Sequence, residues 1–242
     1  ESPSFAGGFF YGTIYTTYES YNFMQIFLDT ADTSLIEKYF STGLVDGVTT
    51  NPTLIMKSGR DPEDVYQQIS RIGIQDISME VVGDVKTMYN EGSRLYDKFG
   101  PVCTVKVPCS PDGLRVCKML SDEEISVNVT LIFDAAQAIL AAKAGATYVS
   151  PFVGRLDDNS IAGLDLIKSI SDIYNVQDVH QTKILSASIR DVKSVSQSFA
   201  YGANIVTIPP TVFAKMYNHV LTDKGLDQFD KDWTDVQKLV GG

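Results

Sequence analysis

The stretch Val102-Cys103-Thr104-Val105-Lys106-Val107-Pro108 has the composition of a short, buried β-strand. Its residues are mostly apolar or β-branched, and a proline closes it. Lys106 is unusual there, because a lysine is seldom fully buried without a partner or a function. Desolvation would lower the pKa of its amine and leave a neutral nucleophile. The alternative is a lysine that reaches past the strand end to solvent, and this strand alone leaves both open.

Outward from this strand, a unit of one strand followed by one helix is predicted eight times. The predicted strands are 25–29, 47–51, 77–82, 103–107, 126–132, 148–152, 183–189 and 204–208. The predicted helices are 34–41, 62–72, 85–98, 111–121, 135–144, 161–174, 191–201 and 211–218. Because alternating strands and helices form right-handed crossovers, the fold class is α/β with a parallel sheet. Eight units predict a closed (β/α)8 TIM barrel. An open doubly wound sheet is the main alternative, but no Gly-rich phosphate fingerprint follows the first strand.

The barrel is expected to occupy residues 24–223, with a different segment on either side. Residues 1–23 hold eight aromatic residues and no lysine or arginine. We expect them to be an N-terminal extension, flexible or artificially added; the alternative is an aromatic arm that docks on a neighbouring subunit. Residues 224–242 are expected to form an extra C-terminal helix, since apolar residues from Leu226 to Leu239 recur at helical steps. Its apolar stripe would pack on its own barrel or on another subunit.

Composition narrows the possible functions and the compartment. The net charge of −10 disfavours binding to nucleic acid or to an anionic membrane surface. Three cysteines without a CxxC spacing favour reduced thiols and a cytoplasmic location. The two histidines lie far apart in the sequence, so we expect no metal site. No apolar run is long enough to suggest a transmembrane helix.

Polar residues occur on seven of the predicted strands, mostly towards the C-terminal half, where barrel enzymes place their active sites. They are Asp29, Thr49 with Asn51, Glu80, Lys106, Asn128 with Thr130, Ser150, and Ser186 with Ser188. Each could be a satisfied core group or a helix cap, whereas the whole set predicts a common pocket. A lysine beside carboxylates suits a Schiff base on a carbonyl substrate. Arg155 and Arg190, each just past a strand, could bind a phosphate or be solvated surface residues.

Five motifs together resemble the transaldolase family. They are Phe27-Leu28-Asp29-Thr30-Ala31, Gly47-Val48-Thr49-Thr50-Asn51-Pro52, Val105-Lys106-Val107-Pro108, Asn128-Val129-Thr130-Leu131-Ile132-Phe133 and Ser150-Pro151-Phe152-Val153-Gly154-Arg155. The compact loops are similar to those of its small subfamily, which also contains the fructose-6-phosphate aldolases. The likeness extends from Met24 to about Lys238.

The resemblance implies a reaction without a cofactor, in which a dihydroxyacetone unit passes between sugar phosphates in the pentose phosphate pathway. The donor would be sedoheptulose 7-phosphate or fructose 6-phosphate, and the acceptor glyceraldehyde 3-phosphate or erythrose 4-phosphate. It implies that Lys106 forms the Schiff base, that Asp29 is the acid/base, and that Glu80 and Thr130 hold a catalytic water. The implied substrate-binding residues are Thr49, Asn51, Asn128, Ser150, Phe152, Arg155, Ser188 and Arg190.

Two other functions stay open. The first is fructose-6-phosphate aldolase, since the aldolases are similar but carry Gln, Tyr and Ala where this chain has Glu80, Phe152 and Ser150. A phenylalanine cannot donate a proton to the bound intermediate, so we expect transfer to dominate. The second is a non-catalytic, sugar-phosphate-binding barrel. The resemblance also implies a homo-oligomeric ring, commonly a decamer, in which the C-terminal helix reaches a neighbour.

Overall fold

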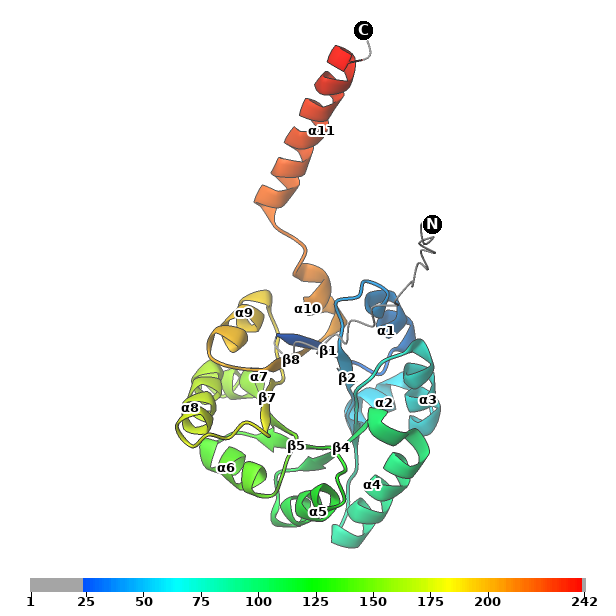
Figure 1. Ribbon diagram of the computed structural model, residues 1–242, viewed down its shortest axis with the longest axis vertical. Coiled ribbons are helices and arrows are strands. Elements are labelled where there is room, and N and C mark those ends of the chain that lie inside the picture. Colours follow the sequence, from blue (N-terminus) through cyan, green and yellow to red (C-terminus); the bar gives the residue numbers. More distant parts are fainter. Residues whose placement is uncertain (1–23, 241–242) are drawn as a thin grey trace, which may run out of the picture.

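A closed barrel of eight parallel strands forms the centre of the molecule (Figure 1). The computed structural model describes residues 24–240. The strands follow in chain order and the first pairs with the last. They are β1 (Gln25–Asp29), β2 (Gly47–Thr49), β3 (Ile77–Glu80), β4 (Cys103–Pro108), β5 (Val127–Ile132), β6 (Tyr148–Pro151), β7 (Lys183–Ser186) and β8 (Ile205–Ile208). The predicted (β/α)8 TIM barrel is therefore confirmed.

The eight predicted helices surround the barrel (Figure 1). They are α1 (Thr33–Phe40), α3 (Pro62–Ile72), α4 (Val85–Phe99), α5 (Pro111–Asp122), α6 (Ala135–Lys143), α8 (Gly163–Val176), α9 (Val192–Ala200) and α10 (Pro210–Lys215). A short 3-10 helix, η1 (Gly100–Val102), leads into β4. Side chains cap several of these helices; the Asp32 carboxylate, for example, accepts from the first backbone N–H groups of α1.

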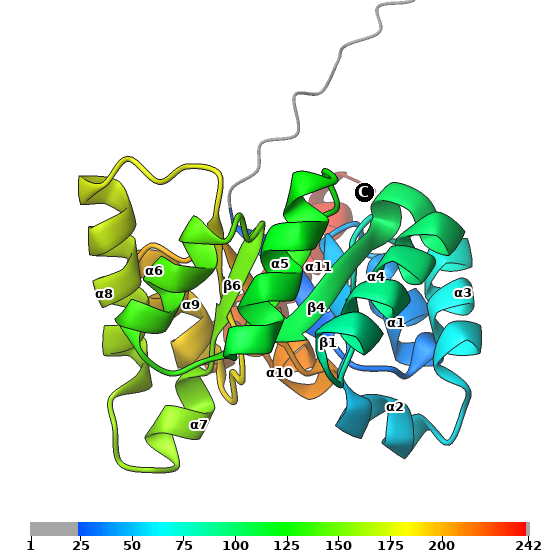
Figure 2. The same ribbon diagram turned by 90° about the horizontal axis from the view of Figure 1, so that it is seen from below.

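Two short helices were not predicted, α2 (Pro52–Ser58) and α7 (Val153–Asp157). Both are too short to show a clear helical period in the sequence. They directly follow β2 and β6, so they lie at the C-terminal end of the barrel, and Figure 2 shows them on the same side of it. The two helices therefore border the end at which we expect the active site.

Four strands, β2, β3, β6 and β7, end earlier than predicted, and for β2 and β7 the reason is local. β2 ends at Thr49 because the Asn51 side chain accepts a hydrogen bond from the Leu54 N–H and caps α2. β7 ends at Ser186, and Ser188 has a φ of +59°, which lies outside the strand region. Both differences place polar residues in loops at the barrel mouth.

Apolar side chains fill the space between strands and helices, as expected for parallel strands that are buried on both faces. Inside the barrel, Phe27 packs edge-on against Tyr148 with ring centroids 6.2 Å apart. A Cβ on Gly47 would lie 2.6 Å from the Phe27 ring, so only glycine leaves room for this aromatic plug. The plug lies on the N-terminal side of Asp29 and Thr49 and so closes the barrel beneath them.

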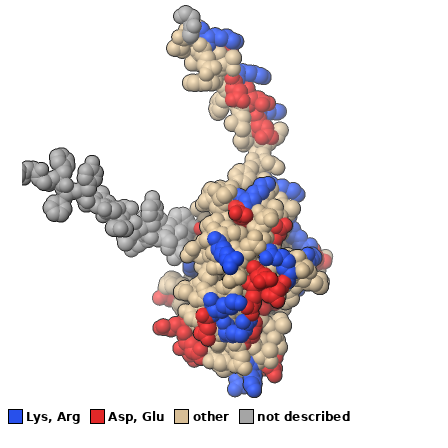
Figure 3. All heavy atoms as spheres, turned by 90° about the vertical axis from the view of Figure 1, so that its right-hand side faces the viewer, with Lys and Arg blue, Asp and Glu red and all other residues tan. Residues whose placement is uncertain are grey.

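The outer surface mixes charges of both signs. Figure 3 shows acidic and basic side chains side by side on the face over α3 and α4. There Glu63 forms ion pairs with Arg94 and Lys98, and Arg94 also pairs with Glu91. No helix within residues 24–240 combines the length and apolar character that crossing a membrane requires.

The last helix, α11 (Val220–Val240), projects away from the barrel (Figure 1). It begins four residues before the predicted boundary, and none of its residues is buried. Phe229 and Trp233, on its apolar stripe, are 70% and 63% exposed. The expectation that this stripe packs on its own barrel is therefore wrong, because the helix leaves the barrel wall. The expectations for residues 1–23 lie outside the described residues.

Candidate active site

Lys106 lies in the middle of β4 and is only 4% exposed. Its ammonium nitrogen is 3.1 Å from Glu80 Oε2 and donates to the Thr50 carbonyl oxygen at 3.0 Å. Glu80 is its register partner on β3, so the parallel pairing itself brings the two charges together. The alternative of a lysine that reaches solvent is excluded. Because the amine is paired with Glu80, its use as a nucleophile requires that a proton move to a neighbouring group.

Asp29 ends β1 and is held by the neighbouring strand. Thr49, its register partner on β2, donates a hydrogen bond to Asp29 Oδ1 at 2.8 Å. Burial raises the pKa of the Asp29 carboxyl above its ordinary value, while the nearby Lys106 and the Thr49 hydrogen bond act in the opposite direction. A carboxyl group under these opposing influences is suited to both accepting and returning a proton.

Two adjoining hollows open around these groups, with volumes of about 330 and 120 Å³. They share the lining residues Asn51, Lys106, Phe152 and Arg155. Glu80 and Thr130 line the larger hollow, whereas Asp29, Thr49, Ser150 and Ser188 line the smaller one. The structure thus gathers most of the predicted site residues around the amine of one lysine.

Thr130 lines the larger hollow and carries a buried, unsatisfied hydroxyl. The residue is 1% exposed, and its Oγ1 has no hydrogen-bond partner among the described residues. The next residue, Leu131, has a φ of +61°, and the pairing of β5 with β6 shifts register at this point. Strained backbone and bulges are common beside active sites. A buried hydroxyl without a partner needs a water molecule or a ligand, and Glu80 lies on the same hollow to share it.

Asn128 supports the pocket from beneath rather than lining it. It is fully buried; its amide donates to Ser78 Oγ at 3.1 Å, and its carbonyl oxygen accepts from Ser150 Oγ at 2.7 Å. In this arrangement it orients Ser150. Ser186, part of the predicted polar set, does not join the pocket, because its hydroxyl lies 2.9 Å from Ser198 Oγ of α9.

The two candidate phosphate-binding arginines differ in their surroundings. Arg155 lines both hollows, and its guanidinium lies 5.0 Å from the centre of the Phe152 ring. Arg190 lines neither hollow and forms two hydrogen bonds with the Asp158 carboxylate, at 2.8 and 2.5 Å. A Cβ on Gly154 would lie 2.1 Å from the Ser188 carbonyl oxygen, so this glycine lets α7 and the loop after β7 approach each other.

Thr207 of β8 is a site residue that sequence analysis missed. It lines the smaller hollow, and its hydroxyl lies 2.6 Å from Thr49 Oγ1. Thr207 is the single polar residue in the apolar run Ile205–Ile208, and that signal would have extended the set of polar strands from seven to eight.

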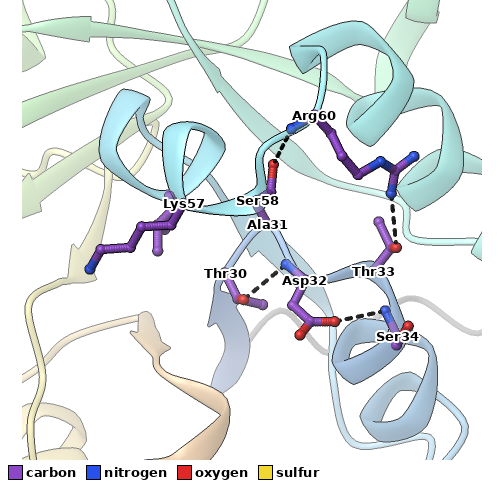
Figure 4. Close-up of a pocket in the computed structure, with 9 residues that line it drawn as sticks. Thr30, Ala31, Asp32, Thr33, Ser34, Lys57, Ser58 and Arg60 are labelled. Atoms are coloured by element: carbon purple, nitrogen blue, oxygen red, sulfur yellow. Dashed lines mark hydrogen bonds between the residues drawn. The ribbon is translucent and has the colours of Figure 1, made fainter.

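A third hollow, of about 500 Å³, lies beside the mouth between the β1–α1 loop and α2 (Figure 4). Its polar groups largely bind one another: Arg60 donates to Thr33 Oγ1 and Gln68 Oε1, and Asp32 caps α1. It lacks the grouping of lysine and carboxylates found around Lys106. Within residues 24–240, the structure brings together no cluster of three or more histidine, cysteine or acidic side chains suited to a metal ion.

Comparison with solved structures identifies the fold alone. A flavocytochrome b2 variant with bound sulfite superposes with a TM-score of 0.59 at 13% sequence identity. The match covers 80% of this chain, and this chain spans 58% of the length of that one. This degree of similarity is consistent with a shared barrel architecture.

Comparison of sequences is more specific. The family model described as "Transaldolase/Fructose-6-phosphate aldolase" matches residues 26–240. A "Probable transaldolase" of Paracoccus denitrificans (strain Pd 1222) is 52% identical over 219 residues, which cover 90% of this chain and all of that protein. One of Caulobacter vibrioides (strain NA1000 / CB15N) is 53% identical, again over 90% of this chain and all of its own length. One of Nitrosopumilus maritimus (strain SCM1) is 49% identical over 88% of this chain and 96% of its own. The chain therefore belongs to the transaldolase/fructose-6-phosphate aldolase family.

Proposed function

We propose that this enzyme is a transaldolase that uses Lys106 to carry a dihydroxyacetone unit from a ketose phosphate to an aldose phosphate. The observation that carries the proposal is the buried amine of Lys106, 3.1 Å from Glu80 and on the wall of a hollow that Asp29 also lines. An amine with two acids on one pocket can form a Schiff base and move the protons that this chemistry requires.

The first step is imine formation. The ammonium of Lys106 passes a proton to a neighbouring carboxylate, and the free amine attacks the C2 carbonyl of the ketose. The carbinolamine then loses its hydroxyl as water and becomes a protonated imine. Glu80 and the unpartnered Thr130 hydroxyl line the same hollow, which suits them to hold the water that shuttles these protons.

The second step breaks the bond between C3 and C4. Asp29 removes the proton of the C4 hydroxyl, C4 becomes an aldehyde, and the electron pair of the broken bond moves into the iminium. The aldose phosphate leaves, and a dihydroxyacetone enamine stays on Lys106. An acceptor aldehyde then enters, the enamine carbon attacks it, and Asp29 returns its proton to the new hydroxyl. The influences of burial and of Lys106 on the pKa of Asp29 suit this double task.

Substrate recognition is assigned to the other lining residues. Asn51, Thr49 and Ser150 would hydrogen-bond the hydroxyls of the three-carbon unit, with Asn128 orienting Ser150. Arg155 and Ser188 at the rim would bind the phosphate, since a guanidinium makes paired, charge-assisted hydrogen bonds to phosphate oxygens. Arg190 could join them by releasing Asp158 or by binding with the N–H donors that Asp158 leaves free.

Transfer rather than release of free dihydroxyacetone is favoured by Phe152. Its ring lines both hollows and carries no proton donor that could quench the enamine. The test is a coupled assay with fructose 6-phosphate, with and without erythrose 4-phosphate. We expect product formation to depend on the acceptor. Release of dihydroxyacetone at the same rate without an acceptor would instead assign fructose-6-phosphate aldolase activity.

We also propose that the enzyme is a cytoplasmic homo-oligomer of the pentose phosphate pathway, in which α11 contacts a second copy of the chain. The proposal is supported by the exposed apolar stripe of α11, which has no partner among the described residues. Light scattering of the full chain and of a chain without Gly225–Gly242 tests it. We expect a large assembly that the truncation breaks down; equal subunit numbers would exclude this role for the helix.

A further inference from the structure

A short chain of hydrogen-bonded hydroxyl groups ends at the Asp29 carboxyl group. The hydroxyl groups come from the two strands that flank β1. In the closed barrel β1 lies between β2 and β8, so Thr49 and Thr207 approach Asp29 from the two strands that flank it. Thr49 Oγ1 is 2.8 Å from Asp29 Oδ1, and Thr207 Oγ1 is 2.6 Å from Thr49 Oγ1. Thr49 and Thr207 are 2% and 3% exposed, so bulk water does not replace these contacts freely.

Counting protons fixes the direction of this chain. Each threonine hydroxyl has one hydrogen, and an ionised carboxylate can only accept. When Asp29 is ionised, the hydrogen of Thr49 is committed to Asp29 Oδ1. The 2.6 Å contact then requires that Thr207 donate its own hydrogen to Thr49.

The direction can reverse when Asp29 is protonated. The acid can then donate to Thr49, and Thr49 can donate to Thr207, after rotation of the hydroxyl groups alone. The chain therefore satisfies Asp29 in both the forms that an acid/base residue must alternate between, without movement of the backbone. Aligned hydrogen bonds also polarise one another, so the donor at Thr207 strengthens the donation from Thr49 to the carboxylate.

We propose that Thr207 is a positioning residue for the reaction, which acts on Asp29 through Thr49. The inference rests on the proposed function of Asp29 as the acid/base and adds a residue of β8 to it. Thr207 carries no charge, so its influence on Asp29 passes through the hydroxyl chain. The charged groups near Asp29 are Lys106 of β4, which acts on it electrostatically, and Arg155, which lines the same hollow; Glu80 of β3 forms an ion pair with Lys106.

The test compares Thr207→Val and Thr207→Ser with the wild type. Valine keeps the shape of the side chain and removes the hydroxyl, whereas serine retains the hydroxyl. For Thr207→Val we expect kcat to fall about three- to tenfold, the loss of one hydrogen bond, with KM changed less than about twofold. The acid limb of the pH profile of kcat should move to higher pH, because a weaker donation from Thr49 stabilises the carboxylate less. Thr207→Ser should restore both the rate and the position of that limb.

The matched control is Thr104→Val. Thr104 is also 2% exposed on a barrel strand and donates to a buried carboxylate, Asp76 Oδ1, at 2.9 Å. It is the second residue of β4, towards the opposite end of the barrel, so removal of its hydroxyl should lower stability and leave the pH profile of kcat unchanged. Thr207→Ala, which only removes atoms, replaces the valine variant if that variant does not fold.

A second readout separates this inference from the proposed function. The titration of the Asp29 carboxyl carbon, followed by NMR in substrate-free protein, should move to higher pH in Thr207→Val and not in Thr104→Val. A shift without transaldolase activity in the wild type would support the hydroxyl chain and overturn the proposed function. Full activity in the wild type, with an unchanged titration and pH profile in folded Thr207→Val, would overturn the role of Thr207. Failure of Thr207→Ser to restore the profile would do the same.

Discussion

The barrel contains a largely buried carboxyl group near each of its ends, and the two differ in what surrounds them. Asp29 lies at the C-terminal end and Asp76 just before β3 at the N-terminal end. Burial raises the pKa of both, and each accepts a hydrogen bond from a threonine. Asp76 has its other oxygen bonded to the Tyr148 hydroxyl at 2.6 Å and lines none of the hollows described above. Asp29 lies on a hollow together with Lys106.

The difference shows that burial and a raised pKa do not by themselves identify a catalytic residue. At the N-terminal end the polar groups satisfy one another, as a structural network must. At the C-terminal end the buried Thr130 hydroxyl has no partner among the described residues, and the Lys106 amine pairs with Glu80 and shares a hollow with Asp29. The active end is distinguished by polar side chains whose hydrogen-bonding groups only a substrate or water can satisfy.

Removal of the nucleophile should have the largest effect. Lys106→Arg and Lys106→Met should each lower kcat at least about a thousandfold, because neither side chain can form the imine. Lys183→Arg, at the start of β7 and so at the other end of the barrel, is the matched control and should retain activity within about threefold. The measurement is the transfer rate with fructose 6-phosphate and erythrose 4-phosphate. If Lys183→Arg lost as much activity as Lys106→Arg, the two ends of the barrel would not differ in catalytic function.

The two aspartates test the comparison directly. Asp29→Asn should lower kcat about 100- to 10,000-fold, because an amide cannot take the proton of the C4 hydroxyl. Asp76→Asn should keep kcat within about threefold per folded molecule but lower the free energy of unfolding by about 1 kcal/mol or more, since one donor loses its acceptor.

The pH dependence follows from the same assignment. Cleavage needs the ionised form of Asp29, and burial raises its pKa above the ordinary 3.8, so activity should fall as the pH drops through that raised value. Kinetic measurements across pH give kcat, and urea unfolding gives the free energy of unfolding; both are measured for Asp29→Asn and Asp76→Asn. Equal activity in Asp29→Asn and the wild type would show that Asp29 is not the acid/base.

The two arginines at the rim, Arg155 and Arg190, should contribute unequally to phosphate binding, because only Arg155 lines the hollows. Arg155→Gln should raise KM for fructose 6-phosphate about 10- to 100-fold, the loss of a charged hydrogen bond, and affect unphosphorylated fructose far less. Arg190→Gln should have a smaller effect, because Asp158 already binds that guanidinium. Steady-state kinetics with both sugars are the measurement. If Arg190→Gln raised KM more than Arg155→Gln, Arg190 would be the main phosphate ligand.

Thr130→Val should have a smaller effect than the substitutions of Lys106, Asp29 and Arg155. It removes the hydroxyl that we assign to a water molecule, and kcat should fall about tenfold, equivalent to about 1.4 kcal/mol of barrier. Thr104→Val, at the satisfied end, should leave kcat unchanged within about twofold. Single-turnover measurements of imine formation would locate the effect in that step; a loss confined to phosphate binding would contradict the assignment.

The sequence predicted most of the fold because strand and helix signals alternate from Gln25 to α10. It did not predict α2 and α7, which have too few residues for a helical period. It did not predict that α11 leaves the barrel either, since an apolar stripe shows that a face needs covering but not what covers it.

The sequence predicted those site residues whose place in the structure follows from their position on a strand. Glu80 and Lys106 are register partners, and Asp29 ends β1 beside Thr49, so their positions near the strand ends bring all three to one mouth. Side-chain direction decided the remainder: Ser186 faces α9, Asn128 lies beneath the pocket, and Arg190 is held by Asp158. Thr207 was missed although it is a polar residue on the eighth strand, because its place in the pocket depends on its side-chain contact with Thr49, which the sequence does not show.

The most direct test of the account is covalent trapping of its central intermediate. The protein is incubated with fructose 6-phosphate, reduced with borohydride, digested, and its peptides are weighed by mass spectrometry. We expect a reduced dihydroxyacetone adduct on Lys106 and none on Lys183. An unmodified Lys106 in protein that nevertheless transfers the three-carbon unit would contradict it.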